Sequence, residues 1–197
     1  FGAKPRHMGR FARRFGAQPF LCAMSRGFVR EGDQEEAPFI PPRAPLPADV
    51  PNHVTPRGLR ILQEERSALE ADRSKPYESE DAKRRAWAEI DGRLELLNER
   101  ISTAHVVEPL RPAPEEVRFG ASVTFRMLSG PQAGQERTFT IVGVDEASVE
   151  DGRIAFTSPI ARALIGRKRG QEAALVLAGV VQRLQVIDVA YVPDEAA

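Results

Sequence analysis

The chain has a single cysteine, Cys22, among its 197 residues. One thiol cannot form an intrachain disulfide bond, and it cannot supply the several thiolates of a structural zinc site. The three histidines, at positions 7, 53 and 105, lie far apart and lack the spacing of metal ligands. Disulfide scaffolds and zinc modules are therefore excluded, and a reducing, cytoplasmic compartment fits the composition.

The sequence also lacks an excess of either charge and long apolar runs, and it has few tryptophan and tyrosine residues. The 28 basic and 28 acidic residues cancel, whereas a dedicated nucleic-acid binder normally carries a basic excess. The longest apolar runs, such as residues 173–178, are far too short to span a bilayer. One tryptophan and two tyrosines give no pattern of an aromatic-lined pocket. These absences favour a partner other than a membrane or bare nucleic acid.

The first 53 residues have the composition of an arm rather than of a folded domain. Residues 1–30 hold seven basic side chains and no acid, as in an organellar transit peptide. We favour a second interpretation, in which residues 1–23 precede a natural start at Met24. Residues 31–53 contain six prolines, which fix φ and lack an amide donor. We therefore predict that residues 1–53 form a disordered arm, first basic and then proline-rich.

Two amphipathic helices are predicted next. Thr55 followed by Pro56 is a helix-start signal, and the helix should end near Pro76 because proline disfavours helical geometry at the residue before it. A second helix carries apolar residues at alternating spacings of three and four, which is a heptad seam: Trp87, Ile90, Leu94, Leu97, Ile101 and Ala104. We predict an antiparallel coiled-coil hairpin over residues 54–107.

A proline-containing linker at residues 108–114 separates this hairpin from a segment with a different periodicity. Apolar residues alternate with a period of two around positions 117–125, 139–144, 154–156, 175–177 and 184–189, and glycine-containing turns separate these strands. Pro159–Ile165 is the one helical interruption, with Ser158 as its N-cap and Gly166 as its stop. The fold class is therefore α+β, with an antiparallel sheet and one short helix in residues 115–193.

Three ordered segments identify the family that this sequence resembles. They are Ile141-Val142-Gly143-Val144-Asp145-Glu146-Ala147, Gly152-Arg153-Ile154, and Ser158-Pro159-Ile160-Ala161-Arg162-Ala163-Leu164-Ile165-Gly166. Together they resemble the C-terminal domain of the GreA and GreB transcript-cleavage factors. More loosely, residues 55–59 resemble the start of that family's first helix, so the resemblance covers roughly residues 54–192.

The resemblance implies a coiled-coil hairpin followed by an FKBP-like domain that docks at the rim of the secondary channel of RNA polymerase. It implies docking through Ser158, Pro159 and Ile160. Arg162 joins this predicted docking set as part of a basic cluster with Arg167, Lys168 and Arg169, which could contact an acidic polymerase surface or RNA phosphate; an ordinary solvated surface is the competing interpretation. For Ile160 a simple core role is the competing interpretation. The hairpin would enter the channel and contact nascent RNA only indirectly, and acids at its tip would help to hold the polymerase's magnesium ion. The chain would be a monomer with no cofactor, metal site or catalytic residue of its own.

The hairpin tip departs from the family pattern. GreB-like tips read Asp-Arg-Ser-Glu-Asn, whereas this chain reads Asp72-Arg73-Ser74-Lys75-Pro76, so a cation replaces the second acid. The acids that could substitute for it also have an ordinary interpretation, as first-turn residues that favour the positive end of a helix: Glu78, Glu80 and Asp81. The first helix, from Pro56 to Arg73, is also several turns shorter than that of the family.

Three functions follow as hypotheses. The first is a Gre-type regulator of transcription elongation that binds RNA polymerase and occupies the channel without stimulating cleavage. The second is active transcript cleavage through Asp72 with Glu78 or Glu80. The third is an interaction module or prolyl isomerase outside transcription, which rests on analogy of fold alone.

Overall fold

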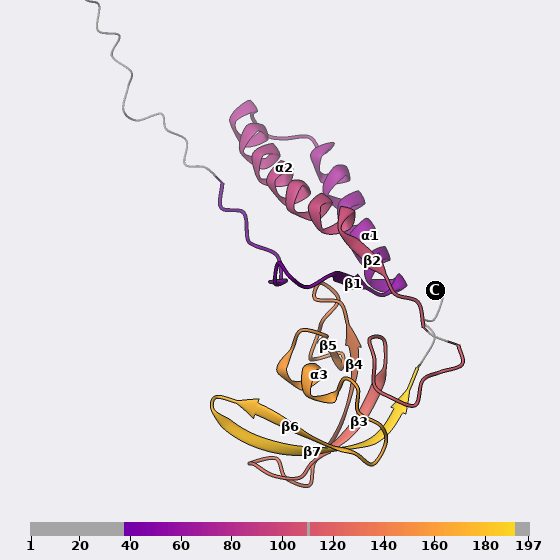
Figure 1. The fold of residues 1–197 in the computed structure, drawn as a ribbon. Helices are drawn as coiled ribbons and strands as arrows, with labels where there is room; N and C mark the ends of the chain where they lie inside the picture. The colour runs from indigo at the N-terminus through magenta and orange to yellow at the C-terminus, as the bar shows by residue number, and fades with distance from the viewer. Residues whose placement is uncertain (1–37, 110, 192–197) are drawn as a thin grey trace, which may run out of the picture. The chain divides into compact units, whose positions relative to one another are not determined.

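The computed structural model describes residues 38–109 and 111–191. The predictions for residues 1–37 lie outside this range. Two helices form a hairpin, and five strands with one short helix form a globular domain (Figure 1). This confirms the α+β fold class. Within the described residues, no helix combines the length and apolar character needed to cross a membrane.

The hairpin consists of α1 (Pro56–Arg73) and α2 (Glu80–Ser102). Thr55 caps α1 by accepting a hydrogen bond from the Gly58 amide at 2.9 Å, and Pro56 occupies the first turn, as predicted. Ser79 caps α2 in the same way through the Ala82 amide, at 3.1 Å. The 18 residues of α1 correspond to a helix about 27 Å long.

Apolar side chains from both helices meet along one seam. Leu62 and Leu69 of α1 and Ile90 and Leu97 of α2 are buried together with Val54. Leu94 and Ile101 pack at the margin of this cluster, as the heptad pattern predicted. Ala104 also packs there, but it lies just beyond the helix in a strand, so its prediction as a helical residue is wrong. The apolar spacing therefore continues past the point where helical geometry ends.

A small parallel sheet closes the base of the hairpin. Strand β1 (Asn52–Val54) pairs with β2 (Ala104–Val106). The buried Asn52 amide donates to the Arg100 carbonyl at 2.8 Å and thus caps the end of α2. The interpretation of the arm as disordered is therefore wrong for residues 38–53, because backbone pairing and side-chain contacts hold this part in place.

The globular domain contains a five-stranded sheet in the order β5-β4-β3-β7-β6. Its strands are β3 (Ser122–Met127), β4 (Glu136–Val142), β5 (Arg153–Ala155), β6 (Glu172–Leu177) and β7 (Val180–Ala190). The prediction of a wholly antiparallel sheet is wrong at one edge, because β5 runs parallel to β4. The connection at residues 143–152 is long enough to carry the chain back to the same end of the sheet, which parallel pairing requires.

The short helix α3 (Pro159–Leu164) packs on this sheet beside β6 (Figure 1). Ala161 and Leu164 are fully buried among residues of the strands, including Phe125 and Ile141. Gly166 follows the helix with φ = +82°, a left-handed conformation that favours glycine, so the predicted stop is confirmed. The core therefore fixes α3 from one side and leaves its other side accessible.

Thr55→Ala is expected to lower the free energy of unfolding by about 1–3 kcal/mol. The Thr55 hydroxyl caps α1 and also donates to Glu146 Oε2 at 2.5 Å, and both side chains are buried. Urea denaturation would measure the loss. Ser79→Ala is the matched control, because it removes a cap at an exposed position where the described part of the chain shows no second partner for the hydroxyl. Equal losses in the two variants would contradict a role for the Thr55–Glu146 contact.

Candidate functional site

The exposed side of α3 carries part of the predicted docking set. Pro159 and Arg162 are exposed, and they lie three residues apart on the side of the helix opposite the core. Ser158 caps the helix by accepting a hydrogen bond from the Ala161 amide at 3.3 Å. Ile160 is only partly buried and packs against the core, so the competing interpretation holds for at least part of its surface.

A basic stretch follows α3 directly. Arg167, Lys168 and Arg169 are all exposed. The Lys168 ammonium lies 3.3 Å from a carboxylate oxygen of Glu115. Together with Arg162, these side chains place several cations at the C-terminal end of α3.

The hairpin tip pairs Asp72, the first of the predicted tip acids, with a cation. Lys75 Nζ lies 2.6 Å from Asp72 Oδ1; the Lys75 side chain is largely exposed and that of Asp72 about half exposed. The hydrogen bond to Asp72, supported by the attraction between the two charges, raises the pKa of the Lys75 ammonium. The Tyr77 hydroxyl donates to the Asp72 carbonyl at 3.0 Å. The Asp72 carboxylate is thus held by a cation from its own turn.

The three substitute acids are not brought together with Asp72 into one cluster. Glu80 and Asp81 lie in the first turn of α2, where their charges favour the helix. Each forms an ion pair one turn along, with Lys83 at 3.6 Å and with Arg84 respectively. Glu78 is exposed in the connection before the cap. In the described parts of the chain, no group of three or more acidic, histidine or cysteine side chains has the arrangement of a metal site.

Trp87 is only partly buried and does not belong to the apolar cluster between the helices, so its predicted place in the seam is wrong. The Arg73 guanidinium lies 5.0 Å from its ring centroid and the Lys83 ammonium 4.8 Å, so two cations contact its π system. Its indole N–H donates to the Arg73 carbonyl at 3.2 Å. Arg73 also pairs with Asp91 at 3.0 Å. These contacts stiffen the last turn of α1 and thereby position the tip.

A network of charged residues that the sequence did not reveal lies near the base of the hairpin. Arg43 donates to both carboxylate oxygens of Glu65, each at 3.0 Å, and through Nε to Asp145 Oδ1, also at 3.0 Å. Arg100 Nε lies 3.1 Å from the other Asp145 oxygen. Burial of the Arg43 guanidinium works to lower its pKa, but the hydrogen bonds and charges of Glu65 and Asp145 outweigh this and raise it.

Two neighbouring residues of the globular domain thus contact the hairpin base. Asp145 binds the two arginines, and Glu146 accepts the hydrogen bond from Thr55. Gly143 lies just before them, where an added Cβ would come within 2.8 Å of the His53 carbonyl oxygen. The segment that carries the family resemblance therefore also forms the joint between sheet and hairpin. Local sequence gives no signal for this, because Thr55 and Arg43 lie 91 and 102 residues from their partners, and Arg100 is also distant from Asp145 along the chain.

Comparisons with known proteins identify a family model and relatives that are similar to this chain. The family model described as "Transcription elongation factor, GreA/GreB, C-term" matches residues 112–191. The transcription elongation factor GreA of Hyphomonas neptunium is 38% identical over 129 residues, which cover 64% of this chain and 80% of that protein. The transcription elongation factor GreB of Neisseria meningitidis is 32% identical over 165 residues, covering 75% and 98% respectively.

The solved structures found by comparison are less similar to this chain in sequence, and only weakly similar to it in fold. The GreA factor homolog Gfh1 of Thermus thermophilus is 19% identical with a TM-score of 0.33, covering 70% of this chain and 97% of its own. A GreA/GreB factor from Nitrosomonas europaea is 21% identical with a TM-score of 0.34, covering 71% and 98%. The identity and coverage of the GreA and GreB relatives decide the assignment: this chain belongs to the GreA/GreB family of transcription elongation factors.

Proposed function

We propose that this protein binds RNA polymerase at the rim of the secondary channel and regulates elongation without stimulating transcript cleavage. The globular domain, FKBP-like in this proposal, docks through the exposed side of α3 around Pro159 and Arg162. The hairpin, acting as a short coiled coil, enters the channel. The protein acts as a monomer, binds no cofactor of its own, and meets nascent RNA only indirectly, through the polymerase.

The Lys75–Asp72 ion pair is the observation that carries the proposal. Lending oxygen ligands to a magnesium ion requires carboxylates that are free to approach it. Here the Asp72 carboxylate is 2.6 Å from an ammonium group, and that charge also repels a divalent cation. Glu80 and Asp81 are paired with cations of α2. Glu78 alone has no such cation partner among the described residues. One unpaired carboxylate does not supply the two that the resemblance implies, so this tip does not fit a shared magnesium site.

The length of the hairpin supports the same conclusion. An 18-residue α1 reaches about 27 Å, which is several turns less than the resemblance implies for a cleavage factor. The tip would therefore stop short of the polymerase's active site. A factor of this kind can still narrow the channel and compete with other factors for the same rim.

Two assays with the full chain test the proposal. We expect the protein to co-sediment with core RNA polymerase, and to release no short RNA from a stalled, backtracked complex that an authentic GreB cleaves in parallel. Release of short RNA that Asp72→Asn abolishes would establish the cleavage hypothesis in its place. Failure to co-sediment would contradict polymerase binding itself.

A further inference from the structure

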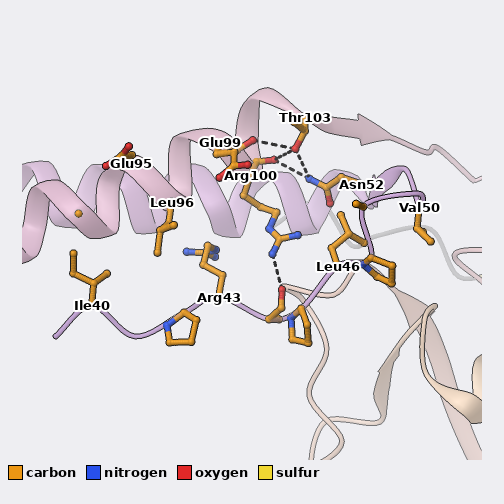
Figure 2. A pocket seen from close by; sticks show the side chains of 16 residues that line it. Ile40, Arg43, Leu46, Val50, Asn52, Glu95, Leu96, Glu99, Arg100 and Thr103 are labelled. Atoms are coloured by element: carbon orange, nitrogen blue, oxygen red, sulfur yellow. Dashed lines mark hydrogen bonds between the residues drawn. The ribbon is translucent and has the colours of Figure 1, made fainter.

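The proline-containing segment at residues 38–50, termed the strap below, runs along α2 in extended form (Figure 2). Ile40 lies directly against Gly92, where even a methyl group on the helix would come within 1.9 Å of Ile40 Cδ1. Ala44 accepts a hydrogen bond through its carbonyl from Arg100. The strap thus contacts the helix at two points separated by two turns.

Arg43 of the strap forms hydrogen bonds with two further parts of the molecule. Its guanidinium contacts Glu65 on α1 and Asp145 in the loop after β4. Side-chain exposure is 18% for Arg43 and 8% for Asp145, so water screens this pair less than it screens a surface ion pair. The contact with Glu65 is bidentate, which fixes direction as well as distance. One side chain therefore ties the strap, the hairpin and the globular domain together.

The rest of the strap does not pack closely against α2 along its whole length. An open groove of about 820 Å³ separates it from α2, lined by apolar side chains such as Leu46, Val50 and Leu96. If the Ile40 and Arg43 contacts were lost, the hydrogen bond from Arg100 to the Ala44 carbonyl would still connect this segment to α2. The prolines limit the conformational freedom that is lost when the strap docks, so few contacts suffice.

We propose that residues 38–50 restrain the hairpin relative to the globular domain, and that Arg43 is the positioning residue of this restraint. The restraint sets the direction in which the hairpin points. Its consequence for polymerase, a hairpin already aligned for the channel when the globular domain docks, rests on the proposed function. The restraint itself does not, and its test needs no polymerase.

Distances between two spin labels test the restraint in the full chain. Labels at Glu78→Cys on the tip and Arg137→Cys on β4, in a Cys22→Ser background, report the position of the hairpin relative to the sheet. We expect one narrow distance distribution in this parent. Arg43→Ala is expected to broaden the distribution, and Arg43→Lys to broaden it less, because lysine keeps the charge but loses the bidentate geometry. Arg60→Ala, an exposed arginine on the same helix as Glu65, is the control.

Gly92→Ala provides a second and independent variant. Alanine favours the helical conformation over glycine, so α2 itself is not weakened, but the new methyl group must displace Ile40. We expect the distance distribution to broaden while the helical circular dichroism signal is kept. Asn98→Ala, at an exposed site on α2, is its control. Unchanged distributions in Arg43→Ala and Gly92→Ala, or equal broadening in the Arg60 control, would overturn the proposal.

Discussion

Leu164→Ala is expected to lower the free energy of unfolding by about 2–5 kcal/mol. Leu164 is fully buried and forms the core side of α3, so removing its side chain leaves a cavity between this helix and the sheet. The short helix has only six residues and cannot persist without that contact. Polymerase binding is expected to fall with stability, because α3 presents the proposed docking surface.

Urea denaturation, monitored by far-ultraviolet circular dichroism of the backbone, measures this loss of stability. Ile165→Ala is the matched control, since Ile165 is the next residue and is 40% exposed. We expect its loss to stay below about 1 kcal/mol, as for substitutions outside the core. Similar losses at both positions would mean that the sheet does not hold α3 through Leu164.

The predictions that proved correct depend on signals that are local in sequence. Thr55 and Pro56 mark a helix start because a cap needs only residues within the same turn. The heptad spacing located the buried seam at Ile90 and Leu97 for a similar reason, since neighbours on one helix face recur every three or four residues. Ser158 and Gly166 bounded α3 in the same way.

The predictions that failed depend on pairing between distant segments. β1 has three residues and follows a proline-containing stretch, so nothing local marks it as a strand. Its partner β2 lies about fifty residues away. The parallel direction of β5 was missed for the same reason, because a three-residue strand has no sequence feature that sets its orientation.

The contacts of Arg43 with Glu65 and Asp145 show most clearly which part of the candidate site could not be predicted from the sequence. Arg43 is an isolated cation among prolines, and its local sequence favoured an unstructured linker. Its partners Glu65 and Asp145 lie 22 and 102 residues further along the chain. Only the fold brings them together, and only then does Arg43 become a candidate positioning residue. At the tip, by contrast, Asp72 and Lys75 are only three residues apart. The sequence alone therefore predicts that a cation stands beside the first acid.

Pro159→Arg is expected to weaken binding to core RNA polymerase on the order of thirtyfold or more, equivalent to about 2 kcal/mol, the size of a hot-spot residue. Pro159 is exposed in the first turn of α3, where the bulk of an arginine keeps the partner surface from close contact without entering the core. Stability should change by less than about 1 kcal/mol. This variant therefore loses binding and keeps its fold, whereas Leu164→Ala is expected to lose both.

Co-sedimentation over a range of polymerase concentrations measures the effect. Pro131→Arg is the matched control, because it introduces the same side chain at an exposed proline in the connection between β3 and β4. We expect it to bind like the unsubstituted protein, which would show that added positive charge alone is tolerated. Undiminished binding by Pro159→Arg would mean that the polymerase contacts another face of the domain, and that the exposed side of α3 is not the docking surface.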